Sequence, residues 1–400
     1  MPAVPRSLGV VGLAGRHVSV QPPSTSAADL RLGGRPVPLL GTVRAYVCGI
    51  TPYDVTHVGH ASTFVWADLF GALATLAGAR VHSCRNVTDV DDVLTHAAWR
   101  RSRDYDEFAL GQEFLFGRDM AALRIRTPTY EPRARHHVDD VIRLTAVLLR
   151  QGAAYERDGH VWFKGGHVPA GCGLGPEEAT RLAVQGGDDP SDSRKDDPFD
   201  VPLWRPSDEH HPAWPSPWGW GRPGWHVECA AMATAVLGAS VDVLAGGADL
   251  TFPHHAYQVA MAEAATGVTP FARARLPVGT VHVNGQKMAK STGNLVLVSD
   301  LLQTHRAADV RMLLLHRPWA AAWELRDSDL DEAAARVDAL YEVSARTGAE
   351  RTGGRGAEST ADRELLEALL DDLDVPAAVA IALESGGSTA RALLKVLALE

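Results

Sequence analysis

"CGITPYDVTHVGHAS", residues 48–62, joins a short apolar run to a long one. The run that leads into it, "VRAYVCGI", has the length and composition of a buried strand. The run that follows, "HASTFVWADLFGALATLAG", has the length and apolar spacing of a helix ending near Gly78, and "ARVHSCRNVTDVDD" predicts a second strand. Strand, helix and strand in this order predict a βαβ unit with a parallel sheet, in which ligands bind at the carboxyl ends of the strands. The quoted stretch is therefore expected at a ligand crevice.

The same alternation resumes near residue 225. A helix is predicted in "WHVECAAMATAVLG", a strand in "SVDVLAGG", a helix in "HHAYQVAMAEAATG" and a strand near "VGTVHVNG". These elements indicate a second half of the same α/β sheet. The chain is expected to comprise an N-terminal extension (1–44), the first half of the catalytic domain (45–125), an insertion (126–204), the second half (205–305) and a C-terminal helical domain (306–400).

Composition excludes several classes of protein. The first residues lack the charged and apolar regions of a signal peptide, and no run approaches about 18 apolar residues, so a cytoplasmic protein without a membrane span is expected. Four cysteines in 400 residues do not make a disulfide framework, which leaves them as core residues, ligands or nucleophiles. The net charge is −10, and residues 321–400 carry 17 Asp and Glu against 8 Lys and Arg. This balance argues against a chain that wraps nucleic acid.

Two short motifs suggest phosphate chemistry. His57 and His60 flank Gly59 at the predicted start of a helix, where a glycine lets the backbone approach a phosphate and the helix end supplies N–H groups. A capped helix with incidental histidines is the alternative. "NGQKMAKSTGN", residues 284–294, sets Lys287 and Lys290 between glycines, as suits a mobile clamp on a triphosphate. Taken alone, this segment could equally be a solvated loop.

Together, HVGH after the first strand and KMAKS after the last resemble the paired signatures of class I aminoacyl-tRNA synthetases. That resemblance implies a Rossmann-like, doubly wound catalytic domain. Within the class the chain resembles the cysteinyl-tRNA synthetases and, more closely, their shorter relatives, the cysteine ligases of mycothiol biosynthesis. The resemblance is carried by "YVCGITPYDVTHVGH", "NVTDVDD", "KDDPFDVPLW", "SPWGWGRPGWHVECAAM", "GGADLTFPHH" and "GQKMAKSTGN". Only about 105 residues follow the KMAKS loop, which agrees with the ligases better than with the synthetases.

The resemblance implies a zinc ion held by Cys48, Cys229 and His254. Spacing alone would make the two cysteines buried filler, since 181 positions separate them. A thiophilic metal with three protein ligands keeps a position open for a substrate thiolate, whereas the hydroxyl of serine is a poor ligand. Where the synthetases have a glutamate four residues after the histidine, this chain has Gln258, which favours the three-ligand arrangement.

The resemblance also assigns the remaining site residues. Thr51, Thr88 and Trp225 would line the amino-acid pocket; Gly59, His60, Gly247, Asp249, Lys287 and Lys290 would bind ATP; and His57, His60, Lys287 and Lys290 would act on the phosphates, bridged by Mg²⁺. For Trp225 the alternative is core packing, and for Asp249 it is a helix cap before "FPHH".

We therefore expect an ATP-dependent ligase that forms cysteinyl-adenylate and passes the cysteinyl group to the amine of glucosaminyl-inositol. The chain departs from the family pattern at Ala245, Ala248, Ala256 and Gln258, which leaves the amino acid and the amine in question. Three alternatives remain: a paralogue with another small-molecule amine or amino acid, a cysteinyl-tRNA synthetase, and a catalytically silent binding protein on the same scaffold. The expected partners are cysteine, ATP and an amino sugar, with neither tRNA nor a membrane. The sequence does not indicate an oligomeric state.

Overall fold

The computed structural model describes residues 29–53, 56–289, 292–346 and 360–400. At its centre lies a parallel sheet in the order β10–β9–β3–β4, with bounds Ala272–Val278, Val241–Gly247, Thr42–Ile50 and Arg80–Val87. The chain runs from β3 to β4 on one side, and β9 pairs with β3 on the other. The carboxyl ends of β3 and β9 therefore diverge at a topological switch point, where α/β sheets bind ligands. The predicted Rossmann-like fold is confirmed.

Strand β3 shows how the sequence divides its side chains between the two faces of the sheet. Val43, Ala45 and Val47 belong to the core formed with α1 (Val58–Leu76), while Tyr46 and Cys48 belong to the core formed with α7 (Trp225–Leu237). This alternation is the two-residue period of a strand. It places the Cys48 sulfur on the α7 face, where Cys229 lies.

The last strand of the sheet is a correction to the prediction. The strand expected near "VGTVHVNG" is instead β11 (Val281–Val283), which pairs with β12 (Gln286–Lys287) and β13 (Trp323–Glu324) in a small separate sheet. The edge of the parallel sheet is β10, whose sequence "ARARLPV" alternates charged and apolar residues. Arg273 on this strand forms an ion pair with Asp242 of β9 at 2.8 Å. The charged residues of β10 are therefore compatible with a strand at the edge of the sheet.

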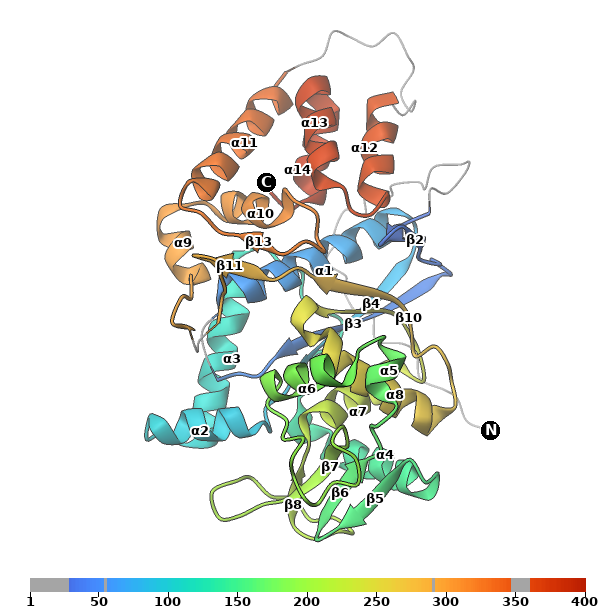
Figure 1. Ribbon diagram of the computed structural model, residues 1–400. Coiled ribbons are helices and arrows are strands. Elements are labelled where there is room, and N and C mark those ends of the chain that lie inside the picture. The colour runs from blue at the N-terminus through green and yellow to red at the C-terminus, as the bar shows by residue number, and fades with distance from the viewer. Residues whose placement is uncertain (1–28, 54–55, 290–291, 347–359) are drawn as a thin grey trace, which may run out of the picture.

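Residues 138–223 form a layer beneath the parallel sheet, coloured green in Figure 1. An antiparallel sheet runs in the order β5–β6–β7–β8. The hairpin expected in "YERDGHVWF" is β5–β6. The bounds in this layer are α4 Val138–Arg150, β5 Ala154–Arg157, β6 His160–Phe163, α5 Val168–Gly171, α6 Pro176–Gln185, β7 Val201–Pro206 and β8 Gly221–Pro223. The long loop region expected over 164–222 thus contains two helices and two strands.

Two short strands, β1 Arg31–Leu32 and β2 Arg35–Pro36, precede the parallel sheet in the chain. The other helices are α2 Asp92–Arg100, α3 Tyr105–Ala122, α8 Ala256–Thr266, α9 Val298–Thr304, α10 Ala307–Leu315, α11 Ser328–Ser344, α12 Thr360–Leu370, α13 Val375–Ser385 and α14 Gly387–Val396. Helices α10–α14 form the upper end of the molecule in Figure 1, and their apolar faces share one core with α1. In the parts of the chain that the structure covers, no helix combines the length and apolarity needed to cross a bilayer.

A buried ion pair links the C-terminal helices to α1. Arg311 on α10 is fully buried, and its Nη2 lies 2.9 Å from Asp68 Oδ2 on α1. Its other nitrogens donate to the carbonyl oxygens of Leu397 (2.7 Å) and Leu123 (2.9 Å). Every side of the guanidinium therefore has an acceptor, which is the condition for burying a charge.

Candidate active site

A cavity of about 330 Å³ lies at the switch point between β3 and β9. Its lining comes from both halves of the sheet and from the segment around β11 and β12. The predicted site residues that line it are Cys48, Thr51, His57, Gly59, His60, Thr88, Trp225, Cys229, Gly247, Asp249, His254 and Lys287. Residues far apart in the sequence are thus brought to one cavity. Lys290 lies outside the described residues.

The three predicted metal ligands form a buried cluster in the cavity lining. The sulfurs of Cys48 and Cys229 and a ring nitrogen of His254 all lie within 4.8 Å of one another. His254 Nε2 is 3.2 Å from Cys229 Sγ. Burial lowers the pKa of His254 well below its usual value and raises the pKa of the Cys48 thiol. Neutral imidazole is the metal-binding form, and a cation would stabilise the thiolates in this apolar setting, so the donor set fits a thiophilic metal.

Two neighbours of the cluster define its shape. The Trp225 ring stacks on the His254 ring with centroids 4.1 Å apart, so Trp225 both packs on the cluster and borders the cavity. Gln258 is fully buried, and its Oε1 lies 3.6 Å from Cys48 Sγ. The Gln258 amide therefore contacts the Cys48 sulfur, although Gln258 is not one of the three predicted metal ligands.

The histidines of the HVGH motif stand at the start of α1. His57 is the N-cap, and its Nδ1 accepts hydrogen bonds from the backbone N–H groups of Gly59 (3.1 Å) and His60 (3.4 Å). The two rings stack with centroids 3.8 Å apart. A Cβ at position 59 would lie 3.0 Å from the His57 ring, which explains the glycine. The capping alternative thus describes His57 correctly, and the ring takes up two of the N–H groups that the motif was expected to offer a phosphate.

Both rings are neutral before any anion enters the cavity. Burial, followed by the neighbouring His60, lowers the pKa of His57 to about 3. Burial lowers the pKa of His60 to about 4, although Asp249 acts in the opposite direction. Phosphate oxygens would favour the protonated forms. The histidines can therefore act as neutral donors or take up a proton when a polyphosphate binds.

Lys287 and Asp249 both line the cavity and pair with each other. Lys287 Nζ on β12 lies 2.6 Å from Asp249 Oδ2, and each side chain is roughly half exposed. Asp249 sits inside a short 3₁₀ turn, and no capping hydrogen bond from its side chain is found there, so the helix-cap alternative is wrong. The lysine is thus held over the cavity by a carboxylate that an incoming phosphate could displace.

Another part of the cavity lining carries hydroxyl and amide groups. Thr51 Oγ1 and Thr88 Oγ1 lie 2.8 Å apart, and Thr88 Oγ1 also lies 3.2 Å from the carbonyl oxygen of Ile50. Asn86 lines the cavity as well, with its Nδ2 3.4 Å from Cys229 Sγ. Sequence reasoning missed Asn86, although its place at the carboxyl end of a predicted strand was a signal for it.

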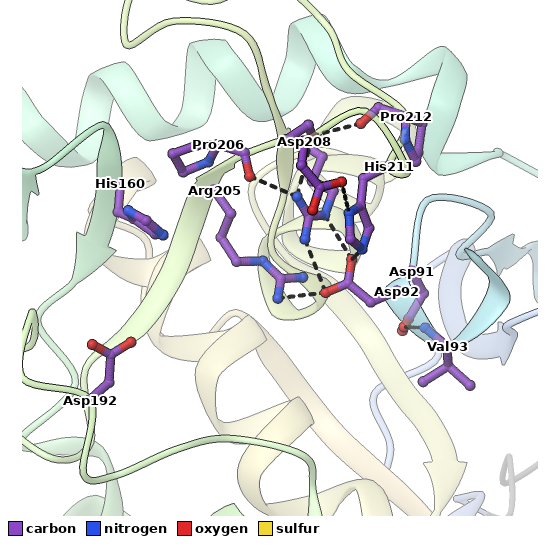
Figure 2. A network of polar contacts seen from close by, with 12 residues as sticks. Asp91, Asp92, Val93, His160, Asp192, Arg205, Pro206, Asp208, His211 and Pro212 are labelled. Atoms are coloured by element: carbon purple, nitrogen blue, oxygen red, sulfur yellow. Dashed lines mark hydrogen bonds and ion pairs between the residues drawn. The ribbon is translucent and has the colours of Figure 1, made fainter. Parts of the chain in front are cut away.

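An ion network holds the loop that carries Thr88 against the lower layer. Asp92, the first residue of α2, forms ion pairs with Arg205 (Nη1 at 2.8 Å) and Arg222 (Nε at 2.7 Å). Figure 2 shows Arg205 and His211 converging on Asp92 from the β7–β8 side. His211 in turn contacts Asp208 at 2.6 Å. The antiparallel sheet therefore fixes the position of one wall of the cavity.

Comparison with known families agrees with this geometry. A family model described as the tRNA synthetases class I (C) catalytic domain matches residues 38–335. The L-cysteine:1D-myo-inositol 2-amino-2-deoxy-α-D-glucopyranoside ligase of Streptosporangium roseum is 41% identical over 343 residues, covering 85% of this chain and 83% of the relative. The ligase of the same name from Acidothermus cellulolyticus is 42% identical over 342 residues, covering 84% and 83%.

The fold is also similar to that of a solved synthetase. Mycobacterium tuberculosis methionyl-tRNA synthetase in complex with methionyl-adenylate superposes with a TM-score of 0.62 at 16% identity, covering 86% of this chain and 82% of that one. At that identity the likeness concerns the fold alone. The resemblance drawn from the HVGH and KMAKS motifs is confirmed by the sequence comparisons.

Proposed function

We propose a function for this chain from the premise that it belongs to the family of class I tRNA synthetase (C) catalytic domains, together with the L-cysteine:1D-myo-inositol 2-amino-2-deoxy-α-D-glucopyranoside ligases. The chain is an ATP-dependent ligase that activates cysteine as cysteinyl-adenylate and transfers it to the amine of glucosaminyl-inositol. One observation carries this proposal: a single cavity is lined by the Cys–Cys–His cluster, by both HVGH histidines and by Lys287 of the KMAKS segment.

The first step joins the amino acid to the nucleotide. A carboxylate oxygen of cysteine bonds to the α-phosphorus of ATP as the bond from that phosphorus to the bridging oxygen breaks, and pyrophosphate leaves. Negative charge grows on the leaving group, so donors and cations near it lower the barrier. His57, His60 and Lys287 would supply them, with Mg²⁺ arriving on the nucleotide. No protein nucleophile is needed, since positioning and electrostatics suffice.

The second step forms the amide. The neutral amine nitrogen attacks the carbonyl carbon of the adenylate, AMP leaves, and the nitrogen releases a proton to water. The acidic balance of residues 321–400 supports a small-molecule acceptor over tRNA, because a surface that grips phosphates needs net positive charge.

Selection of cysteine is assigned to the cluster. When bound, zinc would offer an open coordination position to the substrate thiolate, which serine cannot fill well. Cys48, Cys229 and His254 would hold the ion; Trp225 packs on His254, and the Thr51 and Thr88 hydroxyls border the amino-acid space.

ATP–pyrophosphate exchange with each of the twenty amino acids, with and without a zinc chelator, tests this function. We expect exchange with cysteine alone, abolished by the chelator. Product analysis with glucosaminyl-inositol and with cysteine tRNA then separates the two acceptors. Exchange with a different amino acid would show that Ala245, Ala248, Ala256 and Gln258 have redirected the site, and exchange with none would favour the silent scaffold.

A second prediction concerns the loop lysine. Lys287→Ala should slow adenylate formation in a single turnover on the order of 10²-fold, the usual cost of losing one transition-state donor, with little change in cysteine affinity. The fold should be unaffected, because Lys287 and Asp249 are both half exposed. Lys395→Ala, which removes an exposed lysine on α14, serves as the control. A single-turnover rate equal to that of the wild type would remove Lys287 from the mechanism.

A further inference from the structure

Asn86 contacts the Cys229 sulfur and the backbone of Gly49, the residue after Cys48, and has no role in the function proposed so far. We propose that Asn86 is a positioning residue: its side-chain amide donates an N–H···S hydrogen bond that holds the Cys229 sulfur and reduces the negative charge that this sulfur gives to the metal. This inference deepens the proposed function, since it rests on the Cys48–Cys229–His254 cluster as a metal site.

The orientation of the amide follows from its contacts. Asn86 Oδ1 accepts a hydrogen bond from the Gly49 backbone N–H at 2.9 Å, and Nδ2 lies 3.4 Å from Cys229 Sγ. Of the two ends of the amide, only the oxygen can accept a hydrogen bond from the Gly49 N–H, so the oxygen must face Gly49. The NH₂ group is then left to face the sulfur.

The surrounding backbone keeps this amide in place. The backbone of Gly49 approaches β4 so closely that a Cβ on this residue would lie 1.7 Å from the backbone carbonyl oxygen of Asn86. The backbone N–H of Thr88 donates to Ile50 O at 2.9 Å just beyond. Asn86 itself is 1% exposed. The residue after Cys48 and the sulfur of Cys229 are therefore tied to one side chain, although one lies on β3 and the other on α7.

A donor to a thiolate has an electronic effect as well as a geometric one. Hydrogen bonds to ionised groups are stronger than those between neutral groups, and outer partners of metal ligands tune both affinity and ligand charge. Without the donor, the Cys229 sulfur would be richer in electrons and less restrained. The consequence should be visible in the metal site even when no substrate is present.

Two variants separate the contacts of the amide. Asn86→Ala removes both. Asn86→Asp keeps an oxygen for the Gly49 N–H but turns a second oxygen toward the sulfur in place of the donor. Val87→Ala is the matched control, because Val87 is a buried neighbour on β4 that packs into the core on the α1 face, away from the sulfurs.

The readouts are the sulfur-to-cobalt charge-transfer bands of full-length protein loaded with Co²⁺, and the rate at which a chelator removes Zn²⁺. Both Asn86 variants should shift the bands to longer wavelength and release zinc at least roughly tenfold faster, as is usual when an outer partner of a ligand is lost. Val87→Ala should match the wild type in both.

The outcomes are distinct. If Asn86→Asp has wild-type bands and zinc release, the amide only tethers Gly49, and the N–H···S inference is overturned. A wild-type protein that binds neither Co²⁺ nor Zn²⁺ overturns the inference together with the proposed metal site. Shifted bands in a protein that shows no cysteine-dependent exchange would support the inference and overturn the proposed function.

Discussion

Replacing Cys229 by Ser yields a protein that purifies without zinc and no longer discriminates for cysteine. The substitution exchanges a thiolate ligand for a hydroxyl that stays protonated at neutral pH, in a cluster with only two other donors from the predicted set. Cysteine-dependent pyrophosphate exchange should fall at least about 100-fold. Losing a residue that only hydrogen-bonds a metal ligand can already cost that much, and here a ligand itself is lost. Metal analysis and exchange kinetics measure the two effects.

ATP binding should survive this substitution, because His60, Asp249 and Lys287 are not part of the three-residue cluster. Equilibrium dialysis with ATP checks this. Cys84→Ser is the matched control: Cys84 is equally buried on the same face of the sheet, yet it lies outside the three-residue cluster. Full zinc content in Cys229→Ser, or equal loss of zinc in Cys84→Ser, would contradict the assignment of Cys229 as a metal ligand.

The second large effect concerns stability. Arg311→Met should lower the free energy of unfolding by about 3–5 kcal/mol, the usual cost of removing one member of a buried ion pair. The substitution leaves Asp68 with Arg126 alone, at 3.0 Å, and deprives two carbonyl oxygens of their donor. Urea unfolding followed by circular dichroism gives the value.

Arg336→Met on α11 provides the comparison. Arg336 makes an ion pair with Glu332 at 3.2 Å in which both side chains are solvent-accessible, so its loss should cost under about 1 kcal/mol. Similar losses in the two variants would show that Arg311 does not join the C-terminal helices to α1.

The predictable part of the fold came from apolar runs of clear length. Strand β3 and helix α1 are almost continuously apolar on their buried faces, with Asp68 as the buried exception on α1, and their order along the chain implied a parallel sheet. Strand β10 was missed because two arginines interrupt its pattern, and a strand at the edge of a sheet can carry them. The two-residue strand β13 is too short to give any periodic signal.

The site was predictable only where a motif marked it. Cys48, Cys229 and His254 came from the family resemblance, because the cysteines lie too far apart for spacing to relate them. The same reason hid the contact of Asn86 with Cys229 and that of Asp92 with Arg222, which join residues 143 and 130 positions apart. The domain boundaries and the roles of the individual site residues remain predictions.

The pairing of β3 with β9 also has a consequence for how the chain acquires its structure. Ala45 lies opposite Val243, so this pairing closes a loop of about 200 residues, and such distant pairings make folding slow. The hairpin β5–β6 within that loop is local and can form early. On the ribosome, the Cys48 thiol must wait for Cys229 and His254 to be synthesised. The three predicted ligands are thus complete only after β3, β4 and β9 have been made, and before β10 closes the sheet.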